Sequence, residues 1–222
     1  PLDKKASEKI IYSREEFNEL HNNCAGKHLA MLTSCLANGQ NIKNYLDYNH
    51  AHQKNIRKIF NKFTETKLSK KNFSLDGCSA PQYSFKIKSI SNALNNLIKS
   101  YKNNYHYAEQ VRTLVNSILE NPEFIGGTSS FDTKVMRSSK GKIFCKSGAE
   151  GVFLFVDIKK EISGVIKISD GNERAISITL LNIFKKLKIM NRQELKHLEK
   201  KEKFYLQNHA GKKIGRIESI IK

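Results

Sequence analysis

Three extended, mostly apolar stretches follow one another late in the chain and constrain its fold more than any other feature. They cover residues 143–148, 152–157 and 164–168, and Lys159-Lys160 marks a turn between the last two. Short apolar runs separated by turn residues are typical of consecutive strands. Because helical apolar spacing occurs on both sides of them, we expect an α+β fold, with mixed helices and an antiparallel sheet.

The first half of the chain carries mainly helical patterns. Residues 3–20 show short helical stretches, with Ser13 as a cap ahead of residues 14–16. A helix is expected from Lys27 to about Ala37, where Asn38-Gly39 would end it. A second helix should turn an apolar stripe toward the core, formed by Ile56, Ile59, Phe60 and Phe63.

Two further patterns predict elements later in the chain. A short strand is expected where apolar and polar residues alternate, at Tyr83, Phe85 and Ile87. A long core helix is expected between residues 173 and 187, with one apolar face made by Leu180, Leu181, Phe184 and Leu187. A charged helix from residue 193 to residue 203 should be a solvated face.

The formal charge of +18 is the strongest signal in the composition. Alone it would indicate a nucleic-acid or anionic-surface partner. The lysines are spread over nearly every segment, however, and arginine, which forks onto phosphates and base edges, is sparse. The longest apolar run, residues 152–156, is far shorter than a membrane span, and the first residues do not resemble a secretory signal, so we expect a cytoplasmic protein without a membrane partner.

A polar cluster at residues 21–28 contains a thiol, an amine and two imidazoles just before an apolar helical run. Cys24 and Lys27 would share one face at the positive start of that helix, where a thiol ionises more easily. The alternative is that Cys24 is a small buried hydrophobic residue. Cys35 cannot join it at one metal in an unbroken helix, since 1.5 Å per residue separates the two by about 16 Å.

Three other segments combine reactive or small residues in short loops. Residues 76–81 place an acid, a glycine and a thiol in a tight turn, and residues 125–133 form a loop rich in glycine and hydroxyl groups. Lys146, Ser147 and Gly148 lie where the first of the late strands is expected. Each also has an ordinary reading, as a plain Asp-Gly reversal, a flexible connection or a surface strand lysine.

Together these segments resemble the bacterial asparaginase II family, the Rhizobium-type L-asparaginases. The resemblance covers essentially the whole chain and is carried by residues 22–28 (Asn-Asn-Cys-Ala-Gly-Lys-His), 76–81 (Asp-Gly-Cys-Ser-Ala-Pro), 126–128 with 131–133, 146–151 (Lys-Ser-Gly-Ala-Glu-Gly) and 167–171 (Lys-Ile-Ser-Asp-Gly). It implies a fold similar to serine β-lactamases and glutaminases. The implied reaction is hydrolysis of L-asparagine to L-aspartate and ammonia.

The resemblance also implies roles for individual residues. Cys24, Lys27 and Cys78 would bind zinc, and Asp76 would act beside them as an orienting group of the catalytic site. Lys146 would be a catalytic lysine, because Lys-Ser-Gly is similar to the Lys-Thr-Gly motif of β-lactamase-type enzymes. His28 and Gly148 would contact the substrate.

The resemblance places the nucleophile of the family, in a Ser-x-x-Lys segment, upstream of Cys24. We therefore expect residues 1–222 to be a single domain, the C-terminal portion of such a protein, which holds metal but turns over poorly or not at all. Ser139 and Lys142 repeat the Ser-x-x-Lys spacing only by coincidence. A homodimer remains open, and the competing hypotheses are a basic module that binds nucleic acid or an anionic surface, and a degraded gene product without activity.

Overall fold

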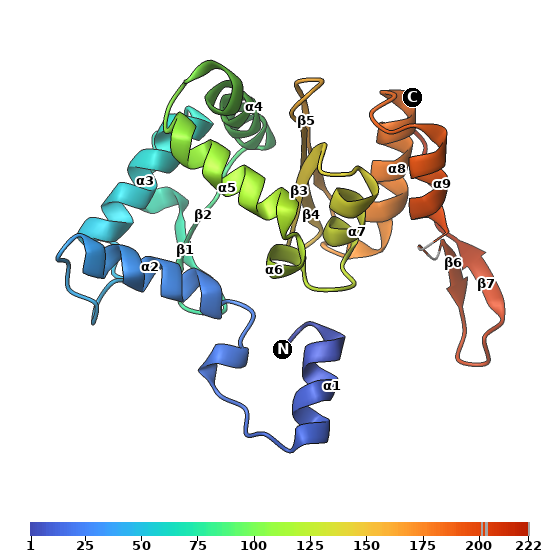
Figure 1. Ribbon diagram of the computed structural model, residues 1–222, viewed down its shortest axis with the longest axis horizontal. Helices are drawn as coiled ribbons and strands as arrows, with labels where there is room; N and C mark the ends of the chain where they lie inside the picture. The colour runs from blue at the N-terminus through green and yellow to red at the C-terminus, as the bar shows by residue number, and fades with distance from the viewer. Residues whose placement is uncertain (201, 203, 222) are drawn as a thin grey trace. The chain divides into compact units, whose positions relative to one another are not determined.

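The structure, a computed structural model, describes residues 1–200, 202 and 204–221 (Figure 1). Its backbone divides into two compact units, Pro1–Asn96 and Leu97–Lys222, which are described separately below. Within the described residues, every helix is too short or too polar to cross a bilayer. The α+β class is confirmed; the single-domain assignment and the β-lactamase-like topology stay predictions.

The first unit is mainly helical and contains one small hairpin. Its elements in chain order are α1 (Lys4–Ser13), a 3-10 turn (Glu19–His21), α2 (Ala25–Ala37), α3 (Ala51–Thr64), a second 3-10 turn (Lys70–Asn72), β1 (Phe73–Leu75), β2 (Pro81–Tyr83) and the first turns of α4 (Ile87–Asn103). The two strands are antiparallel, with Phe73 opposite Tyr83.

The boundaries of these elements agree only partly with the sequence predictions. The helix that ends at Ala37 is confirmed, and Gly39 takes the left-handed φ of 62° just beyond it. Ser13 is the last residue of α1 instead of a cap for a new helix; the cap of α1 is Asp3. The strand expected through Ile87 stops at Tyr83, because the carbonyl of Lys86 already accepts a helical hydrogen bond.

The predicted apolar stripe of α3 is only partly confirmed, since Ile56 and Phe63 are half-buried but the other two members are not. Ile59 and Phe60 are exposed, whereas Gln53 and Arg57 are buried. Gln53 donates to the carbonyl of Tyr45 at 2.9 Å, and Arg57 donates to the carbonyl of Tyr48 at 2.6 Å. These bonds let polar side chains occupy the buried face, so α3 holds the 38–50 loop through its polar residues. Phe60, on the predicted stripe, has ring contacts with Tyr83 and Phe85.

The second unit surrounds a three-stranded sheet. In chain order it contains the remainder of α4, α5 (Ala108–Glu120), α6 (Glu123–Gly126), α7 (Phe131–Ser138), β3 (Ile143–Gly148), β4 (Val152–Asp157), β5 (Ile162–Lys167), a 3-10 turn (Glu173–Ala175), α8 (Ile176–Lys186), α9 (Arg192–Glu199), β6 (Tyr205–Gln207) and β7 (Lys213–Arg216). The expected charged helix is thus α9, and its continuation to residues 201 and 203 lies outside the described residues.

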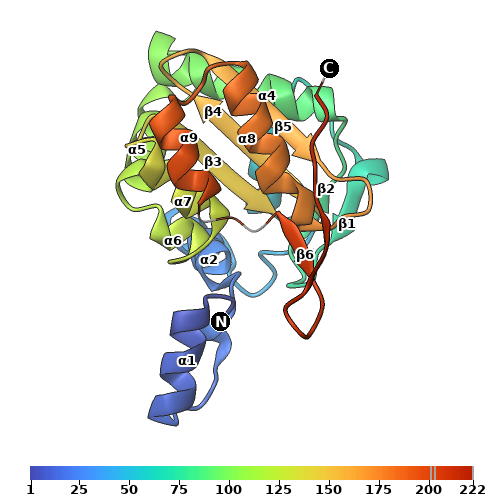
Figure 2. The ribbon, with the colours of Figure 1, turned by 90° about the vertical axis from the view of Figure 1, so that its right-hand side faces the viewer.

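The three predicted late strands are confirmed as an antiparallel meander, β3-β4-β5. Helices α8 and α9 lie over one face of this sheet (Figure 2). Phe153 and Phe155 of β4 pack in the core with Phe184 of α8, and the rings of Phe155 and Phe184 meet edge to face at 5.1 Å. Burial of these side chains fixes the register that pairs Ser147 with Phe153.

Helix α8 follows the predicted apolar face except at its end. Leu180, Leu181 and Phe184 are buried, but Leu187 lies just beyond the last helical residue and is 48% exposed. The backbone leaves the helix there, since the N–H of Ile189 reaches back to the carbonyl of Phe184. The helical spacing therefore identifies three core positions correctly and is wrong for the fourth.

We predict that Leu180→Ala lowers the free energy of unfolding by about 2–5 kcal/mol, because it empties a fully buried position. The matched change Leu187→Ala should cost less than about 1 kcal/mol, because that side chain is half exposed. Urea denaturation followed by circular dichroism measures both. Equal losses for the two variants would contradict the exposure of Leu187.

Candidate active site

The start of α2 presents the first group of expected site residues. Cys24 occupies the N-cap position, and its N–H is accepted by the side chain of Asn22 at 2.8 Å. Lys27 and His28 follow in the first turn and a half of the helix. An Asx turn formed by Asn22 therefore fixes the backbone of Cys24 just before the helix.

The turn between β1 and β2 is built on the carboxylate of Asp76. Its Oδ1 accepts the backbone N–H groups of Cys78 and Ala80, both at 2.9 Å, and the thiol of Cys78 at 3.0 Å. Ser79 adopts a left-handed φ of 68° within the turn. The carboxylate of Asp76 thus shapes the loop that carries Cys78. The segment is therefore more than a plain Asp-Gly turn.

The second oxygen of Asp76 faces the helix. It accepts hydrogen bonds from Lys27 Nζ at 2.6 Å and from the side-chain amide of Gln82 at 3.0 Å. Burial raises the pKa of Asp76, but the bonds from Lys27, Cys78 and Gln82 outweigh it and hold that pKa well below its usual range. Burial lowers the pKa of Lys27, yet the bonds to Asp76 and Cys78 leave it raised, so Lys27 is an ammonium.

His28 connects the loop of Tyr45 to the thiol of Cys78. Its Nδ1 lies 2.6 Å from the hydroxyl of Tyr45, and its Nε2 lies 3.0 Å from Cys78 Sγ. A neutral imidazole donates through one nitrogen and accepts through the other, so this ring can join both groups. No local sequence pattern indicated the contact between His28 and Tyr45, because it depends on how α3 holds the 38–50 loop.

Two thiols and one amine meet at this place. Burial raises the pKa of Cys24, a hydrogen bond with Cys78 raises it further, and the charge of Lys27 partly opposes both. Thiolates and a neutral amine are donors that suit zinc, so the set formed by Cys24, Lys27 and Cys78 fits in kind. Lys27 must first lose the proton that Asp76 now holds in place.

Among the residues that the structure describes, no group of three or more His, Cys, Asp and Glu side chains is arranged to hold a metal ion. The expected zinc ligands are two cysteines and a lysine, and lysine is not one of these four residue types. The other two cysteines, Cys35 and Cys145, are buried, and burial raises the pKa of each thiol. They behave as small core side chains.

The second unit contains the other expected residues, on β3 and beside it. Lys146 Nζ lies 3.6 Å from Oδ2 of Asp132, and it also donates to the carbonyl of Ser147. The same Oδ2 accepts the hydroxyl of Ser147 at 2.8 Å and its N–H at 3.2 Å. Gly148 ends the strand opposite Val152. One carboxylate thus contacts the whole Lys-Ser pair.

Asp132 is the residue that sequence reasoning did not single out. It lies in the first turn of α7, whose cap is the hydroxyl of Ser130, and only 1% of it is exposed. Burial raises its pKa, but Ser130, Ser147 and the charge of Lys146 outweigh this and lower it. The sequence signal that could have revealed a helix start here is a serine cap followed by an acid, at Ser130 and Asp132. Residues 125–133 were instead expected to form a loop.

A cavity of about 630 Å³ in the second unit opens beside this group. Asp132, Ser147 and Phe153 line it together with Arg174. Oδ1 of Asp132 has no hydrogen-bond partner in the described part of the chain, while the nearby Ser130 hydroxyl donates to Thr133. A buried carboxylate oxygen without a partner beside a cavity is a feature typical of a functional site.

We predict that Asp132→Asn lowers the free energy of unfolding near pH 6 by about 1–3 kcal/mol, because the charged acceptor of two hydrogen bonds from Ser147 and of the ion pair with Lys146 is lost. The lowered pKa means that the ionised form stabilises the fold above the unfolded value near pH 3.9, and that this stabilisation disappears as the pH falls through the folded value. The difference between the two proteins should shrink from pH 6 to pH 2 in chemical denaturation. A constant difference would contradict an ionised Asp132.

The comparisons with known proteins bear on what these two groups do. No curated protein matches the sequence at a significant level. One family does match, described as L-asparaginase II, and the match covers residues 1–219, which include every site residue described above. The chain belongs to the L-asparaginase II family.

Proposed function

We propose that the protein is an amidohydrolase that converts L-asparagine to L-aspartate and ammonia. The observation that carries this proposal is the family match over residues 1–219. The geometry supports it in the second unit, where a buried carboxylate lines a cavity of small-molecule size and forms an ion pair with Lys146.

We further propose serine acyl-transfer chemistry in two steps. A serine oxygen bonds to the side-chain amide carbon of asparagine, the carbon–nitrogen bond breaks, and a proton reaches the departing nitrogen to give ammonia. Water then cleaves the ester, which releases aspartate and the serine. By the resemblance, the serine belongs to a Ser-x-x-Lys segment.

Lys146 is the group proposed to move the proton at its Nζ. The carboxylate of Asp132 and the carbonyl of Ser147 hold this nitrogen at the end of the side chain. Holding a proton donor in one position removes the entropy cost of finding it during the reaction. Asp132 acts through Lys146 and is therefore a positioning residue.

The first group is proposed to bind zinc through Cys24, Lys27 and Cys78. When bound, the ion would supply positive charge that keeps both thiols ionised. Asp76 would orient Cys78 by accepting a hydrogen bond from its backbone N–H. It would also accept a hydrogen bond from the ammonium group of Lys27 until zinc takes the place of that proton. His28, which contacts Cys78 and Tyr45, is proposed to face the substrate.

We predict that Cys24→Ala and Cys78→Ala each reduce bound zinc from about one ion per chain to below about a tenth, because two of three protein donors cannot hold the ion tightly. Cys35→Ala is the matched control and should retain the metal, since Cys35 is fully buried in the core. Elemental analysis after dialysis against metal-free buffer measures the occupancy. Zinc retained by both ligand variants would exclude this site.

We predict that Lys146→Ala, made in the complete reading frame, lowers kcat for ammonia release from L-asparagine by about 100-fold or more, as expected for a proton-transfer residue. Lys9→Ala, an exposed lysine of α1, should remain within about twofold of the parent.

An enzyme assay that couples ammonia release to a colour change gives both rates. Full activity of Lys146→Ala would contradict the role of the lysine.

A further inference from the structure

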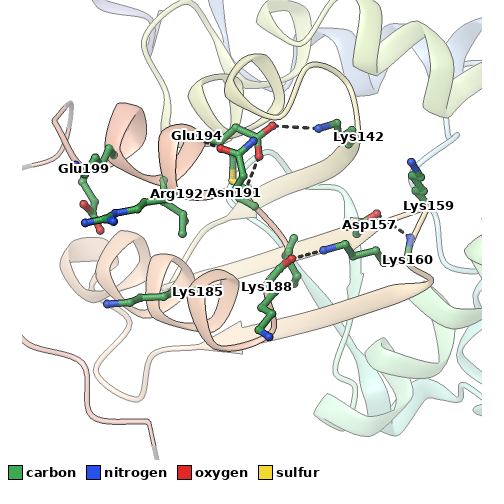
Figure 3. A pocket seen from close by; sticks show the side chains of 14 residues that line it. Lys142, Asp157, Lys159, Lys160, Lys185, Lys188, Asn191, Arg192, Glu194 and Glu199 are labelled. Atoms are coloured by element: carbon green, nitrogen blue, oxygen red, sulfur yellow. Dashed lines mark hydrogen bonds and ion pairs between the residues drawn. The ribbon is translucent and has the colours of Figure 1, made fainter.

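A hollow in the second unit has a strongly basic lining. It encloses about 870 Å³ between the β4–β5 turn, the end of α8 and the start of α9 (Figure 3). Seven lysine or arginine side chains and three carboxylates line it. We call it the basic hollow. It shares no lining residue with the cavity beside Ser147.

Most of the cations in the basic hollow have no anionic partner. Five of them are exposed and form no ion pair with any residue that the structure describes: Lys159, Lys185, Lys188, Arg192 and Lys196. In contrast, Lys142 pairs with Glu194 at 3.1 Å, and the Lys160 ammonium donates to the carbonyl of Lys188. Cations gathered around a concave surface raise the local concentration of anions there.

Two of the three carboxylates are already engaged. Asp157 is 3% exposed and accepts the N–H of Lys160 at 3.0 Å. Glu194 accepts Lys142 on one oxygen and the N–H of Asn191, at 2.8 Å, on the other. They organise the walls of the hollow, and its seven cations outnumber its three carboxylates, so the lining carries a net positive charge.

The floor of the basic hollow is apolar. Ile189, Met190 and Leu195 line it, and their exposures are only 6%, 4% and 8%. A volume of this size with an apolar floor and a few charged groups is typical of small-ligand sites, whereas a nucleic-acid surface is broad and polar. The thioether of Met190 is well suited to contact a flat ring.

We propose that the basic hollow binds a small anion that carries a chain of phosphate groups. Lys185 and Lys188, at the end of α8, and Arg192 and Lys196, on α9, would neutralise the phosphates. A nucleoside triphosphate would also place its base on the apolar floor, and inorganic tripolyphosphate would use the cations alone. The proposal does not depend on the amidohydrolase function.

Isothermal titration calorimetry of the full chain with ATP, tripolyphosphate and adenosine tests the proposal at physiological salt. ATP or tripolyphosphate should bind with one ligand per chain, and Lys185→Ala/Lys188→Ala should weaken that binding by about tenfold or more. The matched double variant Lys5→Ala/Lys9→Ala removes the same charge from exposed positions of α1 and should leave affinity within about twofold. All four positions are exposed, so circular dichroism should report unchanged folds.

The comparison of ATP with tripolyphosphate tells whether the site recognises a nucleotide or only a chain of phosphate groups. Tighter binding of ATP than of tripolyphosphate assigns the site to a nucleotide, and equal binding assigns it to the phosphate chain. An equal loss of affinity in both double variants would show that binding depends only on the total charge of the protein, and it would overturn the proposal. Binding of a DNA duplex that depends on Lys185 and Lys188, with no heat from either phosphate ligand, would also overturn it.

Discussion

The carboxylate of Asp76 is the contact on which the first unit depends. One oxygen shapes the β1–β2 turn by accepting two N–H groups and the thiol of Cys78, and the other joins that turn to α2 through Lys27. A half-buried carboxylate is stable only when such donors satisfy it. The requirement therefore brings together a helix start and a hairpin that lie far apart in the sequence. Cys24, Lys27 and Cys78 meet as a result.

In the second unit, Asp132 has a role similar to that of Asp76 in the first. Here also one acid at the edge of a helix receives donors from a distant strand, and a lysine is among them. The two acids differ in burial: Asp132 is almost fully covered, and one of its oxygens has no partner in the described residues. The first arrangement is thus saturated with donors, while the second keeps an acceptor free beside a cavity.

How far the sequence could predict this structure depends on which force decides each element. The strands of the late sheet and the end of α2 follow local patterns, and both were expected correctly. The buried face of α3 was expected only in part, because hydrogen bonds from Gln53 and Arg57 outweigh its apolar spacing. Motif resemblance placed Cys24, Lys27 and Cys78 together; it could not reveal Asp132, whose importance arises only when α7 packs against β3.

The contacts that hold the 38–50 loop have an evolutionary consequence. Gln53 and Arg57 bind the main-chain carbonyls of Tyr45 and Tyr48, which every amino acid provides. The main-chain anchor at position 45 therefore persists whichever side chain stands there. Substitutions at this position can exchange the group that meets His28 while the carbonyl still accepts the hydrogen bond from Gln53.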